Sequence, residues 1–222
     1  MFYLGRVLRD AVEAEWGDLY RAVRNRLVRD RLAALPLTLT ATLAVLVFQV
    51  LQHTPGGAAL VERVGVVRAS LPLWESLLRT PLSLFVPAPA LPVWGAAAQV
   101  FVVFGVAELA VGRWRTLAVA YAGTLAGTVY ARGGMPWDNV FARDTGPSAA
   151  VVALAVYVAW RCRAWLTAVV TVTAMVLEQV LEPNLAGVEH LAAIACALTV
   201  AAGGELLRAT SGRARGASRA VS

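Results

Sequence analysis

Two residues capable of hydrolytic chemistry lie at the starts of apolar segments in this chain. Ser148 follows Gly146 and Pro147 at the start of one such segment, and His190 begins the last one. A serine hydroxyl becomes a useful nucleophile when a neighbouring base takes its proton, and histidine commonly serves as that base. Because burial disfavours the imidazolium cation, a His190 in apolar surroundings should stay neutral and able to accept a proton. The pair therefore predicts nucleophilic hydrolysis if the fold brings the two side chains together.

Both residues also have purely structural interpretations. Proline is tolerated in the first turn of a helix and serine can satisfy an unpaired amide there, so the sequence 146–148 could simply begin a helix. His190 could instead lie at a helix end, with its ring reaching the membrane interface. Glu189 precedes the histidine, but neighbours on a helix point about 100° apart, so Glu189 is not expected to orient the imidazole.

The composition places this pair in a membrane protein. Of the 222 residues, 59% are hydrophobic, and the mean hydropathy is +0.64, which excludes an ordinary soluble domain. All 20 basic residues are arginine, and they gather at the ends of apolar segments, a distribution that encodes membrane orientation and gives no reason to expect a nucleic-acid partner. The arginine and alanine bias suggests a GC-rich bacterial genome. Cys162 and Cys196 lack metal-ligand spacing, so no metal or cofactor is expected.

Hydropathy divides the chain into three parts. Residues 1–31 are arginine-rich with apolar positions at near-helical spacing, which predicts an amphipathic helix on an anionic membrane surface; a solvated cytoplasmic helix is the alternative. Residues 208–222 are interpreted as a disordered, basic cytoplasmic tail. Between them, residues 32–207 form an all-α membrane domain. Its six predicted transmembrane helices are 32–52, 93–112, 116–131, 147–160, 164–181 and 190–207, with a long proline-rich loop at 53–92.

The arginines also predict the direction of each crossing. Those before the first helix, between the second and third, between the fourth and fifth, and after the sixth fall on one side, which is then cytoplasmic together with both termini. The fourth and sixth helices consequently both begin at the outer face, where Ser148 and His190 should meet. The fourth segment covers only about 21 Å of a hydrocarbon core about 30 Å thick, so Ser148 is expected below the surface, beside a watery cavity.

Several motifs, taken in order, resemble those of the rhomboid family of intramembrane serine proteases. The resemblance covers residues 74–207. The segments similar to the family's helices two and three are FGVAE at 104–108, GRWR at 112–115, and YAG at 121–123 with Gly127. The sequence 146–148 is similar to the Gly-x-Ser nucleophile motif. His190, followed by Ala193 and Ala197, resembles the family's His-x-x-Gly-x-x-x-Gly helix.

This resemblance implies a divergent, rhomboid-like serine endopeptidase in the bacterial plasma membrane. Ser148 would attack the scissile carbonyl of a substrate's transmembrane segment, and His190 would accept its proton and return it to the leaving amine. The Ser148 amide would help to bind the oxyanion, and Gly146 and Ala149 would shape that site. The implied partners are a transmembrane-helix protein substrate and the lipid bilayer, and no cofactor is implied.

The chain departs from the family's pattern around the pair. The positions of the family's oxyanion-assisting His and Asn correspond to Val93 and Ala97, which cannot donate a hydrogen bond, and losing one such donor costs about 2.7 to 4 kcal/mol. Ala149 replaces the usual glycine, and Val152 replaces the tyrosine expected to stack on the histidine. Asn139 is the candidate replacement donor. The alternative function is a non-catalytic rhomboid-like protein that binds transmembrane helices. A small transporter is disfavoured because no polar stripe crosses the bilayer.

Two structural expectations accompany the site. The small residues Ala186, Ala193 and Ala197 lie near one face of the sixth helix around His190, which should allow its close approach to the fourth helix. Glu108, near the end of the second helix, is expected to satisfy backbone or loop amides or to pair with a nearby arginine.

Overall fold

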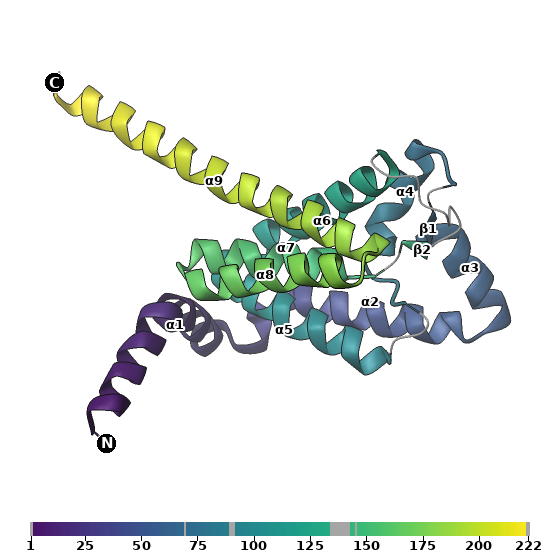
Figure 1. The fold of residues 1–222 in the computed structure, drawn as a ribbon, viewed down its shortest axis with the longest axis horizontal. Helices are drawn as coiled ribbons and strands as arrows, with labels where there is room; N and C mark the ends of the chain where they lie inside the picture. Colours follow the sequence, from purple (N-terminus) through teal and green to yellow (C-terminus); the bar gives the residue numbers. More distant parts are fainter. Residues whose placement is uncertain (1, 69, 89–91, 134–142, 145, 221–222) are drawn as a thin grey trace.

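The computed structural model describes residues 2–68, 70–88, 92–133, 143–144 and 146–220, and nearly all of them are helical (Figure 1). The elements in chain order are α1 (Phe2–Asp30), a 3₁₀ helix (Arg31–Ala34), α2 (Pro36–Gln52), α3 (Pro55–Gly65), β1 (Val67–Arg68), α4 (Leu73–Ser83), α5 (Val93–Val111), α6 (Arg113–Gly133), β2 (Arg143–Asp144), α7 (Ser148–Arg161), α8 (Trp165–Leu181) and α9 (Leu185–Ala220). The predicted helical state of the six apolar segments is confirmed, because α2 and α5 to α9 occupy them.

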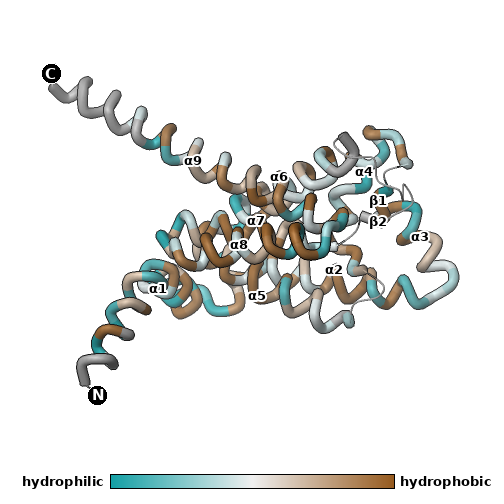
Figure 2. Tube along the Cα trace, in the orientation of Figure 1, coloured by the Kyte–Doolittle hydropathy of each residue, from teal (hydrophilic) through white to brown (hydrophobic). Residues whose placement is uncertain are grey.

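Two helices in the described part of the chain are long and apolar enough on their own to cross a membrane. They are Trp94–Val111 in α5 and Leu185–Arg208 in α9. The apolar helices α7 and α8 are shorter, at 14 and 17 residues. Figure 2 shows hydrophobic residues concentrated along α2, α5, α8 and the first half of α9. These helices support a membrane location, and the arrangement with six crossings stays a prediction.

Helix α6 lies at the centre of the packing and contacts α4, α5, α7 and α9. Its buried face is formed by glycines and threonines, and the Thr124 hydroxyl donates to the Ala120 carbonyl of the same helix at 2.9 Å. Small residues let helix backbones approach closely, which is how helices gain packing energy where lipid is as apolar as leucine. The larger core side chains come from the neighbours of α6, including Phe104 of α5 and Leu154 of α7.

The bundle has two chemically different ends. We call the end with α1 and the α5–α6 and α7–α8 turns the basic end, after Arg113, Arg115, Arg161 and Arg163, and the opposite end, with α3, α4 and the strands, the sheet end (Figure 1). At the sheet end, β1 pairs with β2 in antiparallel register, with Val67 opposite Asp144. Both α7 and α9 begin at the sheet end.

The proline-rich loop predicted at 53–92 is wrong in part, because α3 and α4 form within it. Pro55 occupies the first turn of α3, where its missing amide is not needed, and Thr54 caps that helix by accepting from the Gly57 amide at 3.2 Å. Pro72 immediately precedes α4. The Tyr121 hydroxyl of α6 donates to the Pro81 carbonyl at 3.1 Å and so holds α4 against the bundle. Prolines that suggested a loop therefore mark helix starts.

Helix α9 continues to Ala220 and projects away from the bundle (Figure 1), and the predicted disorder of the tail at 208–222 stays a prediction. Alanine and arginine are strong helix formers. A helix that is already nucleated gains a hydrogen bond for each further residue, so the polar tail extends α9 instead of having to nucleate its own turn.

Helix α1 is fixed to the basic end by the side chain of Glu15. The Glu15 carboxylate accepts hydrogen bonds from the amides of Leu166 at 3.1 Å and Thr167 at 2.7 Å and so caps the start of α8. Trp16 adds a hydrogen bond from its indole nitrogen to the Thr167 hydroxyl at 2.9 Å. Burial opposes ionisation of Glu15, but the hydrogen bonds from Thr167 and Leu166 outweigh it and hold the pKa of the Glu15 carboxyl below its usual range.

Glu15→Ala should therefore release the first turn of α8. Hydrogen exchange of the Leu166 and Thr167 amides is expected to speed up, whereas Glu13→Ala, an exposed acid on the same helix, should leave it unchanged. The ionised form of Glu15 makes these bonds, so its contribution is present at neutral pH and is lost as the pH falls through the lowered pKa. Unchanged exchange in Glu15→Ala would show that the cap contributes nothing to α8.

Candidate functional site

The turn into α7 places Ser148 at the first residue of that helix. Gly146 has φ of +127°, a conformation that L side chains rarely adopt, so a glycine is required here. Its amide donates to the Ser83 carbonyl at the end of α4 at 3.2 Å. Pro147 then precedes the helix with φ of −75°. The turn is therefore built by Gly146 and by α4, which the sequence had suggested was part of a loop.

The first turn of α7 leaves backbone donors free of helical partners. The first bond within the helix runs from the Val151 amide to the Pro147 carbonyl at 2.8 Å, so the amides of Ser148, Ala149 and Ala150 precede the regular ladder. Such amides, beside a nucleophilic hydroxyl, are suited to binding an oxyanion. Ala149 itself is buried, with 6% of its surface exposed.

His190 lies in the second turn of α9, which Asn184 caps by accepting from the Gly187 amide at 2.8 Å. Its side chain is buried, with 8% of the residue exposed. Within the described residues, neither ring nitrogen has a hydrogen-bond partner. Leaving a buried polar group unsatisfied costs about 1 to 3 kcal/mol, so the imidazole is a group for which a ligand or reaction partner should be sought.

Gly123 of α6 brings the starts of α7 and α9 to one point. A Cβ atom added to Gly123 would lie 3.7 Å from the Ala149 carbonyl oxygen and 3.6 Å from the Ala193 Cβ atom. Ala149 follows Ser148, and Ala193 lies about one helical turn after His190. The two helix segments that carry the predicted pair therefore adjoin the same position of α6.

The small residues predicted to allow this approach divide into two groups. Ala193 and Ala197 are buried, with 0% and 1% of their surfaces exposed, and both belong to the core that α7 and α9 share. Ala186 is exposed, so its predicted role in this interface is wrong. Gly127 of α6 instead provides a contact near the start of α9, because a Cβ atom there would lie 3.2 Å from the Glu189 Cβ atom.

The hydrogen bond that would link the pair is not formed in this arrangement. Since the described residues contain no partner for either ring nitrogen of His190, the half-buried Ser148 hydroxyl is not bonded to it. In apo enzymes such bonds are often long and tighten only with substrate bound. The structure thus places the two residues at adjoining helix starts without joining them.

Glu178 of α8 is a neighbour of His190 that the sequence did not assign to the site. Its charge acts electrostatically on the imidazole. A carboxylate in that position would stabilise an imidazolium ion formed when His190 accepts a proton. Residue types alone do not show this relation, because the direction in which Glu178 faces depends on how α8 is rotated against α9.

The structure describes some of the residues that the resemblance placed around the oxyanion, and others lie outside the described residues. Ala97 is half-buried and has no donor. Val152 is also half-buried, on the second turn of α7. The Val93 side chain and the whole of Asn139 lie outside the described residues, so the proposed replacement donor stays a prediction.

An apolar cavity of about 660 Å³ adjoins the segment that carries His190. It lies between α6, α8 and α9, and Val188 and Leu191 of α9 form part of its lining. Apolar pockets with few polar groups are the usual sites for apolar ligands. The sequence did not predict this cavity, because its lining comes from three separate helices.

The described residues contain no group of three or more His, Cys, Asp or Glu side chains that could hold a metal ion. No family model, curated protein or solved structure matches this chain. The chemistry available at the sheet end is that of the hydroxyl of Ser148, the imidazole of His190 and the first-turn amides of α7, which precede the helical hydrogen-bond ladder. That set contains a nucleophile, a base and oxyanion donors.

Proposed function

We propose that this chain is a rhomboid-like intramembrane serine protease that cleaves transmembrane segments of membrane proteins. The observation that carries the proposal is the buried imidazole of His190, which has no hydrogen-bond partner among the described residues and lies on a helix start adjoining the one that presents Ser148. A buried polar group is rarely left unpaired in a merely structural position. The first-turn amides of α7, which have no helical partner, would add the oxyanion donors that acyl transfer needs.

The proposed reaction uses these groups in sequence. The Ser148 hydroxyl attacks the scissile carbonyl while His190 takes its proton, and the carboxylate of Glu178 favours the resulting imidazolium. The oxyanion accepts hydrogen bonds from the amides of Ser148 and Ala149. His190 then returns the proton to the leaving amine, and water hydrolyses the acyl-enzyme. Without a side-chain donor at Ala97, we expect a rate lower by about 100- to 1,000-fold than in a site with that donor.

The proposed setting is the bacterial plasma membrane, with six helices crossing and both termini in the cytoplasm. The basic end would face the cytoplasm, because arginines flank the helices there. The sheet end would then face outward, with α3, α4 and the strands near the outer surface. The apolar cavity beside α9 would receive side chains of the substrate helix.

The second candidate is a non-catalytic rhomboid-like protein that binds transmembrane helices. The missing bond between His190 and Ser148 favours it, as does the absence of a donor at Ala97. It would use the same apolar cavity, and the two candidates differ only in the reactivity of the Ser148 hydroxyl.

A fluorophosphonate probe distinguishes the two candidates, because it reacts with activated serine hydroxyls. The wild-type protein, purified in lipid nanodiscs, should be labelled at Ser148, as located by mass spectrometry. Labelling should disappear in Ser148→Ala and fall by at least about 100-fold in His190→Ala, since general-base catalysis contributes about 100- to 10,000-fold.

Ser211→Ala provides the matched control, because Ser211 is an exposed serine far along α9. Its labelling should equal that of the wild type. A folded wild-type protein that is not labelled, or labelling that persists in Ser148→Ala, would contradict the protease and favour the helix-binding protein.

A further inference from the structure

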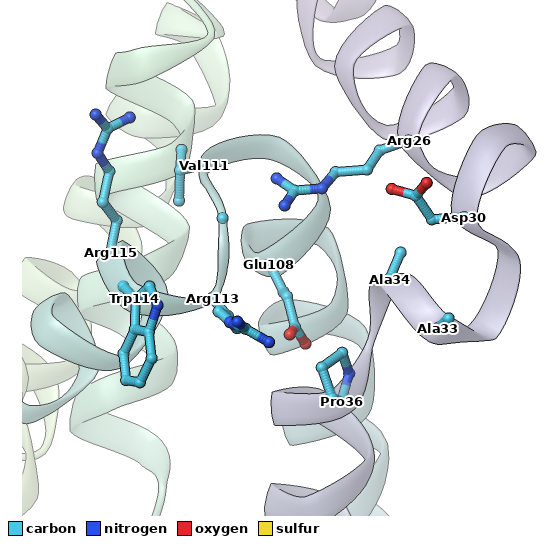
Figure 3. A pocket seen from close by; sticks show the side chains of 11 residues that line it. Arg26, Asp30, Ala33, Ala34, Pro36, Glu108, Val111, Arg113, Trp114 and Arg115 are labelled. Atoms are coloured by element: carbon cyan, nitrogen blue, oxygen red, sulfur yellow. The ribbon is translucent and has the colours of Figure 1, made fainter.

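A second cavity, of about 550 Å³, lies at the basic end of the bundle, opposite the Ser148 end. It is formed where the end of α1, the start of α2 and the α5–α6 turn meet. Three arginines line it, namely Arg26 of α1 with Arg113 and Arg115 of α6. Figure 3 shows Arg26 and Arg113 reaching from different helices toward the same space, whereas Arg115 points away from it.

The acids in this cavity are already engaged. Asp30 accepts two hydrogen bonds from Arg29, from its Nε at 2.9 Å and from a terminal nitrogen at 3.0 Å. Glu108 accepts from the Leu37 and Thr38 amides at the start of α2. By contrast, Arg26, Arg113 and Arg115 form no ion pair within 4.0 Å of any described acid. Three arginines therefore line the cavity with two acids, Asp30 and Glu108, and Asp30 already pairs with Arg29, so the lining carries a net positive charge.

The Arg26 side chain is held against the α5–α6 turn. Its Nε atom is buried and has no hydrogen-bond partner among the described residues. Its guanidinium packs over the α5–α6 turn, with one terminal nitrogen 3.4 Å from the position of a Cβ atom on Gly112. Gly112 has φ of +89°, so a side chain there would be both strained and crowded by Arg26.

The start of α6 adds backbone donors to the same cavity. The first bond into α6 runs from the Thr116 amide to the Gly112 carbonyl at 3.1 Å. The amides of Arg113, Trp114 and Arg115 therefore have no helical partner. Amides at a helix start favour an anion, and arginine is the side chain that best matches the oxygens of phosphate.

The position of the cavity fits a group at membrane depth. It lies at the end of α5, one of the two helices long enough to cross a membrane. Trp114 beside it is 71% exposed, and the Arg113 guanidinium lies 5.4 Å from its ring centroid. Exposed tryptophan and arginine together are typical of the interface at which lipid headgroups lie.

We infer that this cavity binds a phosphate group, held by Arg26, Arg113 and the amides at the start of α6. The phosphate could belong to an anionic phospholipid headgroup or to a free phosphate anion. The inference does not depend on the proposed protease, because the cavity and Ser148 lie at opposite ends of the bundle.

Lipid retention tests the headgroup source. The full-length protein is purified in detergent with equal amounts of phosphatidylglycerol and phosphatidylcholine, and bound lipid is measured by native mass spectrometry. The wild type should retain phosphatidylglycerol. Arg26→Lys and Arg113→Gln should each reduce retention at least about tenfold, because lysine keeps the charge but lacks the planar donor fork. Arg24→Gln, an exposed arginine on α1, should have little effect.

Titration with inorganic phosphate, in nanodiscs that contain only phosphatidylcholine, tests the free anion. A rise in unfolding temperature that is lost in Arg26→Lys supports binding of free phosphate, and phosphatidylglycerol retention without such a rise supports the lipid headgroup. The inference is overturned if neither ligand binds. It is also overturned if Arg24→Gln reduces binding as much as Arg113→Gln, or if Arg26→Lys binds like the wild type, because diffuse surface charge would then explain the binding.

Discussion

Gly123→Ala is expected to slow probe labelling of Ser148 by about 100-fold and to destabilise the fold. The added Cβ atom would lie 2.5 Å from the Ala153 Cβ atom, whereas carbon atoms normally pack about 3.5 to 4.0 Å apart. Helices α6 and α7 must therefore separate by about 1 Å, a displacement that can reduce catalysis about 100-fold when it misplaces reacting groups. Overpacking of this kind costs about 1 to 3 kcal/mol, partly offset by the better helix propensity of alanine.

The Ala153→Gly change supplies a sharp test of this mechanism, because it removes the atom that the new side chain would meet. The double variant Gly123→Ala with Ala153→Gly should recover most of the labelling. Gly204→Ala is the matched control, since a Cβ atom there meets nothing within 4 Å. If the double variant labels as slowly as Gly123→Ala, contact between these two positions is not what aligns Ser148.

The effect of Gly123→Ala on stability can be measured whether or not Ser148 is catalytic. Unfolding can be followed with a thiol-reactive dye in a Cys196→Ala background, where the free, buried Cys162 is the remaining cysteine. Gly123→Ala should expose it at a lower temperature than the wild type, and Gly204→Ala should not. Suppose that Gly123→Ala is destabilised but the wild-type protein is not labelled by the probe. The packing of α6 against α7 would then be supported, and the proposed protease activity would be contradicted.

The helices were predictable because each core helix is one long, predominantly apolar run. The predicted segment 164–181 corresponds to α8 at Trp165–Leu181, and 93–112 corresponds to α5 at Val93–Val111. Such runs need no tertiary information. Helices α3 and α4 were missed because prolines and polar residues dominate 53–92, and because α4 is stabilised by contacts with α6 that local sequence does not encode.

The sequence could predict at which end of the bundle the candidate site lies, but not the directions in which its side chains point. Counting crossings from the arginines was enough to place Ser148 and His190 at the same end, and the structure agrees. The facing of each side chain depends on the rotation of α7 and α9 about their axes, and both helices pack closely against glycines of α6: α7 and α9 at Gly123, and α9 at Gly127. A periodicity argument on α9 alone therefore included Ala186, which is exposed.

Long-range capping by carboxylates was the least predictable feature. Glu15 caps α8 from a helix about 150 residues earlier in the chain. The role of Glu108 was partly predicted, since its carboxylate does satisfy backbone amides. The sequence could not show which amides these are, because no local sequence feature of a helix start identifies a carboxylate that caps it from far along the chain.

Glu108→Ala should cause the largest loss of stability among single substitutions in the bundle. The carboxylate is 1% exposed and accepts from the Leu37 amide at 3.1 Å and from the Thr38 amide and hydroxyl, both at 2.8 Å. Alanine would leave these donors unpaired in a buried place. Because each unsatisfied buried donor costs about 1 to 3 kcal/mol and the Thr38 hydroxyl can rotate toward another acceptor, the two amides should account for a total loss of about 2 to 6 kcal/mol, seen as earlier exposure of Cys162 to the thiol dye.

Glu108→Gln separates the hydrogen bonds from the shape of the side chain, since glutamine has the same size but only one acceptor oxygen. If that oxygen serves Thr38, the glutamine nitrogen must face the Leu37 amide, and two donors then oppose each other. Stability should therefore fall to a value between those of the wild type and Glu108→Ala. Gln99→Ala, an exposed polar position on the same helix, should have little effect. A Glu108→Gln variant as stable as the wild type would mean that filling the space matters and that the second acceptor oxygen does not.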